Sequence, residues 1–322
     1  MNRIAFRVMG GKDIGYGHLY RCLALAKAIT LKTKKYEIIF VVNKEITNIV
    51  RENNFKFIIS KNFNNDLKIF KDLTIDLVVF DSYEADDVYL KSIKQVSKLV
   101  LIDDNNNIYN SKIPDIILNG NIHAKDLNYA KNESTRLLLG PEYLLMKEEY
   151  WITESNHNIE KKGVLITTGG TDPYNISLKI LKKLKNVPIT KIVIIGPGYS
   201  EETTAALYKH SDTKTIYIYK PISLKKYIQK AEFVITASGS TVYEVISQKR
   251  IPIIFSIAEN QEIVYKYFQE FGIPTIGNNS NIQLNKIIPY LNHLQQIDIE
   301  KQLPLIDGKG AIRAAEYVVQ CL

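Results

Sequence analysis

A histidine follows a cluster of glycines near the start of the chain and could act as a general base. Gly15 and Gly17 precede His18 in the stretch Gly10–Ile29, GGKDIGYGHLYRCLALAKAI, which predicts a loop followed by a helix. The glycines let the backbone come close to a ligand, and the free N–H groups of a helix N-terminus attract anions. The positive end of the helix dipole favours a neutral imidazole, which can accept a proton. The alternative is a histidine that only hydrogen-bonds the nearby backbone.

This loop does not match the glycine fingerprint of dinucleotide-binding proteins. The fingerprint has the spacing G-x-G-x-x-G, and an acidic residue follows about 20 residues later at the end of the next strand. Here Gly15 and Gly17 are followed by Tyr20 in place of the third glycine, and the next strand, FVVNK, reaches Asn43 instead of an acid. The sequence therefore argues against NAD, and no cofactor is expected.

A second polar stretch, FDSYEADD at Phe80–Asp87, follows a strongly apolar strand. Asp81 and Tyr83 are therefore expected at a strand end, where open α/β sheets bind their ligands. The alternative is that Asp81 or Ser82 caps the next helix, as short polar side chains commonly do. Both interpretations remain open for this stretch.

The stretch LITTGGTDP also joins a strand to a helix. Gly169 and Gly170 suit a phosphate that the backbone approaches closely, or else only a tight turn. Asp172 is predicted to be the N-cap of the following helix, with Pro173 at its first position.

A third glycine-bearing loop, ITASGSTVYE, includes Ser238, Gly239, Ser240 and Thr241. The functional interpretation places this loop on a diphosphate and Glu244 on ribose hydroxyls. The alternative is a capping box between Thr241 and Glu244, which would explain the glutamate by itself.

In SIAENQE, Asn260 and Gln261 open a helix after another apolar strand. Adjacent carboxamides at a strand end could hold sugar hydroxyls or acetamido groups, although asparagine is also a common N-cap.

The elements that carry these loops alternate between apolar strands and amphipathic helices, which predicts doubly wound parallel sheets. The polar, non-periodic run ITESNHNIEKKG interrupts this alternation. We therefore expect two Rossmann-like domains, at residues 1–152 and 153–322, that face each other across a cleft. The last helix could pack back on the first domain.

Composition narrows the functional class. The chain has 322 residues, a net charge of +8 and two cysteines, Cys22 and Cys321. The lysines are scattered without a basic, aromatic stripe, which argues against nucleic-acid binding. No apolar run is long enough to span a membrane, the N-terminus does not resemble a secretory signal, and the cysteines form no metal or disulfide pattern. These features favour a cytoplasmic protein, and a monomer is expected.

The blocks IGYGHLYRCLALA, FDSYEAD, LIDD, LLGPEYLLM, TTGGTDP, ASGSTVYE, AENQ and DGKGAIRAA occur in this order. In this respect the chain resembles the UDP-sugar hydrolase family of pseudaminic acid biosynthesis and its spore-coat polysaccharide relatives. The resemblance covers Phe6 to about Val318. The family usually has Asp-His-Tyr where this chain has Asp81-Ser82-Tyr83, and many members differ from GGKD in the first loop.

The resemblance implies a GT-B fold, as in the lipid II-forming GlcNAc transferase, with UDP held by the C-terminal half and no metal. It implies hydrolysis of UDP-2,4-diacetamido-2,4,6-trideoxy-β-L-altropyranose by inverting attack of water at C1, with His18, Tyr83 and Asn260 as catalytic residues. The other candidate substrate-binding residues are Gly15, Gly17, Arg21, Asp81, Gly169, Gly170, Ser238, Gly239, Ser240, Thr241, Glu244 and Gln261. Alternatives are a UDP-sugar transferase and a nucleotide-sugar-binding module without catalysis.

Overall fold

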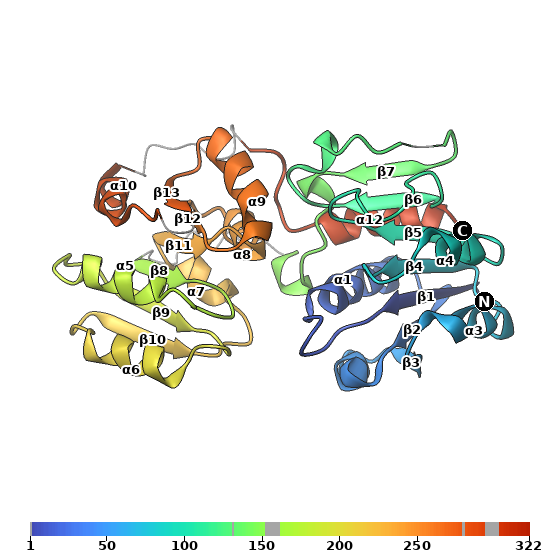
Figure 1. Cartoon of the computed structure of the whole chain (residues 1–322), viewed down its shortest axis with the longest axis horizontal. Helices are drawn as coiled ribbons and strands as arrows, with labels where there is room; N and C mark the ends of the chain where they lie inside the picture. The colour runs from blue at the N-terminus through green and yellow to red at the C-terminus, as the bar shows by residue number, and fades with distance from the viewer. Residues whose placement is uncertain (1, 131, 152–161, 279–280, 294–302) are drawn as a thin grey trace. The chain divides into compact units, whose positions relative to one another are not determined.

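The chain forms two compact α/β units in the computed structural model (Figure 1). Unit 1 comprises Met1–Ile152 and Gly308–Leu322, and unit 2 comprises Thr153–Asp307. The last fifteen residues, which the sequence analysis grouped with the second domain, therefore belong to unit 1. The structure describes residues 2–130, 132–151, 162–278, 281–293 and 303–322, so most of the predicted boundary segment lies outside the described residues.

Unit 1 contains a parallel sheet with the strand order β3-β2-β1-β4-β5-β6-β7. Its strands are β1 Asn2–Val8, β2 Tyr36–Val42, β3 Lys56–Ile59, β4 Leu77–Asp81, β5 Lys98–Ile102, β6 Ile116–Asn119 and β7 Arg136–Leu139. The chain winds outward from β1 to β3 and then returns to the other side of β1 at β4. This reversal is a topological switch point, where the carboxyl ends of the strands leave a crevice for ligands.

Helices cover both faces of this sheet (Figure 1). They are α1 Gly17–Lys32, α2 Thr47–Glu52, α3 Asp66–Asp72, α4 Asp87–Lys94 and α12 Gly310–Gln320. The α1, α2 and α12 helices share one hydrophobic core, whereas α3 and α4 pack on the opposite face. Strand β1 is buried on both faces, which explains its nearly continuous apolar sequence.

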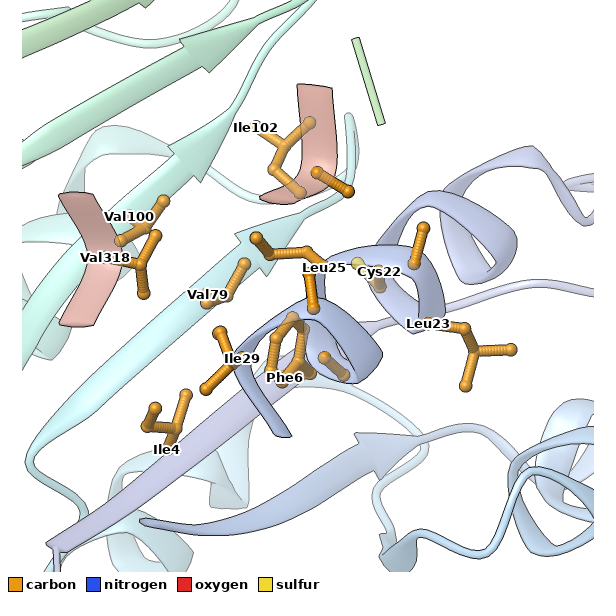
Figure 2. Packing of buried hydrophobic residues seen from close by; sticks show 14 of the residues in the cluster. Ile4, Phe6, Cys22, Leu23, Leu25, Ile29, Val79, Val100, Ile102 and Val318 are labelled. Carbon is orange, nitrogen blue, oxygen red and sulfur yellow. The ribbon is translucent and has the colours of Figure 1, made fainter. Parts of the chain in front are cut away.

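Figure 2 shows how α1 is held against the sheet. Cys22, Leu25 and Ile29 recur at helical spacing and lie over Phe6 of β1 and Val79 of β4. Burying one such aliphatic side chain contributes roughly 1.5–3 kcal/mol. The apolar face therefore fixes the N-terminus of α1 beside the ends of β1 and β4.

The C-terminal helix α12 completes the core of unit 1. Its small residues Ala311, Ala314 and Ala315 are fully buried, and α12 packs against α1. At Gly310 an added Cβ would stand 2.3 Å from the carbonyl oxygen of Leu144. Small side chains are therefore needed for this close approach, which explains why the GAIRAA sequence belongs to unit 1.

Unit 2 repeats the same winding, with the strand order β10-β9-β8-β11-β12-β13, all parallel. Its switch point lies between β8 and β11. The prediction of two Rossmann-like domains is therefore confirmed. The strands are β8 Val164–Thr167, β9 Lys191–Ile195, β10 Thr215–Tyr219, β11 Phe233–Ala237, β12 Pro252–Ser256 and β13 Thr275–Asn278. The helices are α5 Ile176–Leu184, α6 Glu201–Lys209, α7 Lys225–Lys230, α8 Ser240–Ser247, α9 Glu259–Glu270 and α10 Ile287–His293.

In the described part of the chain, none of the helices combines the length and the apolar character that a membrane crossing requires.

Candidate functional site

The switch point of unit 1 brings a histidine and an aspartate together. His18 lies in the first turn of α1, and its Nδ1 is 2.6 Å from Oδ1 of Asp81, the last residue of β4. Because the ionised carboxylate can only accept hydrogen bonds, Nδ1 carries the proton and Nε2 keeps its lone pair. Among the described residues, no hydrogen bond occupies Nε2. The His18 side chain is 15% exposed, so this nitrogen can serve as a base for a bound water.

Arg21 stands one turn further along α1 and connects two carboxylates. Its Nε and Nη2 donate to the two oxygens of Asp81, each at 2.6 Å, and its Nη1 donates to both oxygens of Asp104 at 2.8 Å. The prediction that Arg21 binds the substrate directly remains a proposal, because these side chains already engage Nε and both terminal nitrogens.

Both carboxylates are ionised at neutral pH. Burial alone would raise the pKa of Asp81, but the charge and hydrogen bonds of Arg21 and the hydrogen bond from His18 outweigh burial and lower this pKa. Burial likewise opposes ionisation of Asp104, yet Arg21, Tyr83 and Asn121 lower its pKa to about 2.

Tyr83 joins the same cluster through Asp104. Its hydroxyl donates to Oδ2 of Asp104, and its ring meets the ring of His18 edge-on, with centroids 4.8 Å apart. Burial, followed by the charge of Asp104, raises the pKa of Tyr83, so the phenol keeps its proton at neutral pH. Since the Tyr83 O–H donates a hydrogen bond to Asp104, the hydroxyl oxygen still offers lone pairs on a residue that is 44% exposed.

The structure rejects the helix-capping alternative for Asp81 and Ser82. The cap of α4 is Asp86, whose carboxylate accepts the N–H of Tyr89 at 2.8 Å. Ser82 is buried, and its hydroxyl accepts the N–H of Glu84 within its own turn. Asp81 is therefore available to His18 and Arg21.

Asp104 and Asn121 were missed by the sequence analysis. Asn121 donates to Oδ1 of Asp104 at 2.8 Å. Asp104 follows β5, the strand beside β4 in the sheet, so its position after an apolar strand was the available signal. The LIDD stretch contributed only to the family resemblance.

The backbone of the glycine loop before α1 forms hydrogen bonds within the loop. The backbone groups of Gly11 and Gly15 pair at 3.1 and 2.7 Å, and Asn43 bonds both the N–H and the carbonyl of Gly10. Gly15 has φ +86°, which explains its identity, whereas Gly17 meets no atom within 4 Å of an added Cβ. Asn43, which replaces the acid of the dinucleotide fingerprint, therefore anchors this loop.

The loop after β8 lies at the switch point of unit 2. Gly169 has φ +95°, and an added Cβ at Gly170 would meet nothing within 4 Å. The predicted start of α5 at Pro173 is wrong, because α5 begins at Ile176. Asp172 still supports this start, since its carboxylate accepts the N–H groups of Ile176 and Ser177 at 2.7 and 2.9 Å.

The loop after β11 lies on the other side of that switch point. Gly239 is the N-cap of α8, and none of the described side chains caps this helix. Thr241 is thus inside the first turn, and the predicted capping box with Glu244 does not form. Ser238 is buried and bonds the carbonyl of Gln261, whereas Ser240 is exposed. The first turn of α8 therefore has no side-chain cap on its N–H groups, which an anion could bind.

In the loop after β12, one of the two predicted side chains is engaged by a backbone group of the same loop. The Oε1 atom of Gln261 accepts the N–H of Ile257 at 3.1 Å. Asn260 lies in the first turn of α9, but its side chain is outside the described residues. The predicted catalytic role of Asn260 therefore remains a proposal.

No protein-family model matches the chain. It is 30% identical over 259 residues to the uncharacterised protein MJ1062 of Methanocaldococcus jannaschii. This match covers 76% of the chain but only 53% of that relative, so the chain spans about half of its length. It is 24% identical to the spore coat polysaccharide biosynthesis protein SpsG of Bacillus subtilis, with 94% of both chains covered. It is 26% identical to the UDP-2,4-diacetamido-2,4,6-trideoxy-β-L-altropyranose hydrolase of Campylobacter jejuni, covering 84% of the chain and 97% of that relative.

Solved structures with the same fold include MurG of Acinetobacter baumannii, with a TM-score of 0.67, 14% identity and 100% and 99% coverage of the two chains. A UDP-GlcNAc 2-epimerase from Neisseria meningitidis, bound to UDP-GlcNAc, has a TM-score of 0.66, 11% identity and 99% and 98% coverage. At these identities the likeness concerns the fold alone, and it confirms the predicted GT-B fold class.

Proposed function

Because the chain is similar to SpsG and to the Campylobacter hydrolase over most of its length, we propose that it hydrolyses a UDP-linked diacetamido-trideoxy sugar. The observation that carries this proposal is the 2.6 Å contact between Nδ1 of His18 and Asp81, which leaves Nε2 as a base. Homology supports a UDP-sugar as the substrate, and the geometry of His18 supports water as the attacking group.

In the proposed reaction, the oxygen of a water forms a bond to C1 of the sugar while the bond from C1 to the diphosphate oxygen breaks. Nε2 of His18 takes the water proton, and Asp81 stabilises the imidazolium that forms. UDP leaves with the electron pair of the broken bond, so it needs charge stabilisation more than a proton. A single displacement inverts the configuration at C1.

Unit 2 is proposed to bind the diphosphate through the loops after β8 and β11. Gly170 and Gly239 have neither a positive φ nor a neighbour that would exclude a Cβ, so the fold itself does not require glycine there. The uncapped first turn of α8 follows Gly239 and can bind an anion without a metal.

Replacing Gly239 with valine should weaken UDP binding about tenfold or more, because a side chain would occupy the space of a phosphate. Free space around the site should limit the loss of stability to about 1 kcal/mol, the cost of a poorer N-cap. Titration calorimetry with UDP and urea unfolding measure the two effects, and Gly239→Ala should give a smaller loss of affinity. Wild-type affinity in the valine variant would argue against UDP at this loop.

A UDP-sugar transferase is the second candidate, favoured by the full-length match to a spore coat polysaccharide protein. The test is to incubate the whole protein with UDP-2,4-diacetamido-2,4,6-trideoxy sugars and no acceptor. Hydrolysis predicts UDP and free sugar in equal amounts, and little product from UDP-GlcNAc, which lacks the second acetamido group. UDP release that requires an added sugar acceptor would instead establish the transferase.

A further inference from the structure

Asp104 has no hydrogen bond to His18 within the described residues. It holds Arg21, which contacts both His18 and Asp81. Arg21 Nη2 lies 3.1 Å from Nδ1 of His18, while the same nitrogen donates to Asp81 at 2.6 Å. If Arg21 turned to donate to Nδ1, the histidine would need the tautomer with its proton on Nε2 and would lose its base. Asp104 opposes this rotation because both of its oxygens hold Nη1 at 2.8 Å.

Asp104 also sets the charge of the cluster. The carboxylates of Asp81 and Asp104 and the guanidinium of Arg21 together carry one net negative charge while His18 is neutral. Among the described residues, the other titratable groups that contact these two aspartates are Cys22, Tyr83 and His123, and burial lowers the pKa of His123. Burial raises the pKa of the Cys22 thiol, and burial together with Asp104 raises the pKa of the Tyr83 phenol. Proton transfer to His18 therefore leaves the cluster neutral instead of positive.

We infer that Asp104 is a positioning residue that, through Arg21, keeps His18 in the tautomer that leaves Nε2 unprotonated. The geometry gives Asp104 three donors, Arg21, Tyr83 and Asn121, which fix its carboxylate against the guanidinium. Its importance for turnover rests on the proposed function. Its effect on the histidine can be measured without any substrate.

The test is nitrogen NMR of the whole protein with ¹⁵N-labelled histidine. Five histidines contribute signals, and His18→Asn identifies those of His18. In the wild type, we expect His18 to carry its proton on Nδ1 in the neutral form. In Asp104→Asn, we expect mixed tautomers, because the weakened hold on Nη1 lets Arg21 turn and donate to Nδ1 of His18.

Glu84→Gln is the matched control, since it removes the same charge from an exposed neighbour of Tyr83 that makes no side-chain contact with the cluster within the described residues. Its His18 signals should match the wild type. Asp104→Glu, which keeps a carboxylate for Arg21, should restore the wild-type tautomer at least in part. An unchanged tautomer in folded Asp104→Asn would overturn the inference.

Kinetics separate this inference from the proposed function. If the protein hydrolyses UDP-sugars, Asp104→Asn should lower the plateau of kcat/KM about tenfold, because a smaller share of His18 has the tautomer that can act as the base. If no UDP-sugar is hydrolysed but the NMR differences occur, the positioning role of Asp104 stands and the proposed reaction fails.

Discussion

His18→Asn should lower the rate of UDP release at least about a hundredfold while the protein remains folded. The base at Nε2 is removed, and the water must then attack C1 without transferring its proton to a positioned group. Asparagine retains an N–H donor that can face Asp81, and His18 is only partly buried, so little stability should be lost. Steady-state turnover at saturating substrate measures the effect, and circular dichroism confirms the fold.

His210→Asn is the matched control for this variant. His210 is the C-cap of α6 in unit 2, and its Nδ1 contacts the carbonyl of Ala206. The same chemical change at this position should leave turnover unaltered. Equal UDP release by His18→Asn and the wild type would remove the histidine from the mechanism.

Asp81→Asn should also reduce turnover, by up to about 10⁴-fold, the loss seen when an orienting aspartate of a catalytic histidine is made neutral. An asparagine amide can donate to Nδ1 and so stabilise the tautomer with the proton on Nε2. It also leaves the charge of Arg21 with fewer partners in a buried setting, which should cost about 3 kcal/mol of unfolding free energy. Turnover and urea unfolding measure the two losses separately.

Asp86→Asn provides the comparison, since asparagine caps a helix about as well as aspartate and Asp86 lies outside the cluster. We expect near wild-type turnover and stability for it. An Asp81→Asn protein that keeps both properties would show that the pair with His18 is not functional.

The sequence predicted the fold because parallel α/β sheets have a strong local signature. Apolar strands such as Leu77–Asp81 alternate with amphipathic helices, and each strand end exposes its polar residues on the same edge of the sheet. The loops that carry His18, Asp81 and Tyr83 could therefore be placed at strand ends before any contact was known.

The pairings among polar residues could not be predicted, because they depend on which strands become neighbours and how side chains turn. The sequence left open whether Asp81 caps the next helix, and the structure shows that Asp81 bonds His18 whereas Asp86 caps the helix. Arg21 was expected to bind the substrate, yet it pairs with two carboxylates. The partner of Arg7 could not be predicted either. Arg7 lies in the otherwise largely apolar strand β1 and forms a fully buried ion pair with Asp66.

The exact first residues of α5 and α8 could not be predicted from the sequence either. Asp172 and Pro173 are typical of a helix start, but the loop continues to Asn175, whose left-handed backbone delays α5. Thr241 and Glu244 have capping-box spacing, but the N-cap of α8 is Gly239, two residues before Thr241. Local patterns identify where a helix begins to within a few residues, and the packing of the loop decides the rest.

The most direct measurement of the central claim is the reaction in ¹⁸O-water with a UDP-2,4-diacetamido-2,4,6-trideoxy sugar and no acceptor, analysed by mass spectrometry. Attack of water at C1 predicts label in the freed sugar and none in UDP, with exchange at the anomeric hydroxyl corrected by incubating the free sugar alone. Label in the β-phosphate of UDP would show attack at phosphorus and would contradict the account.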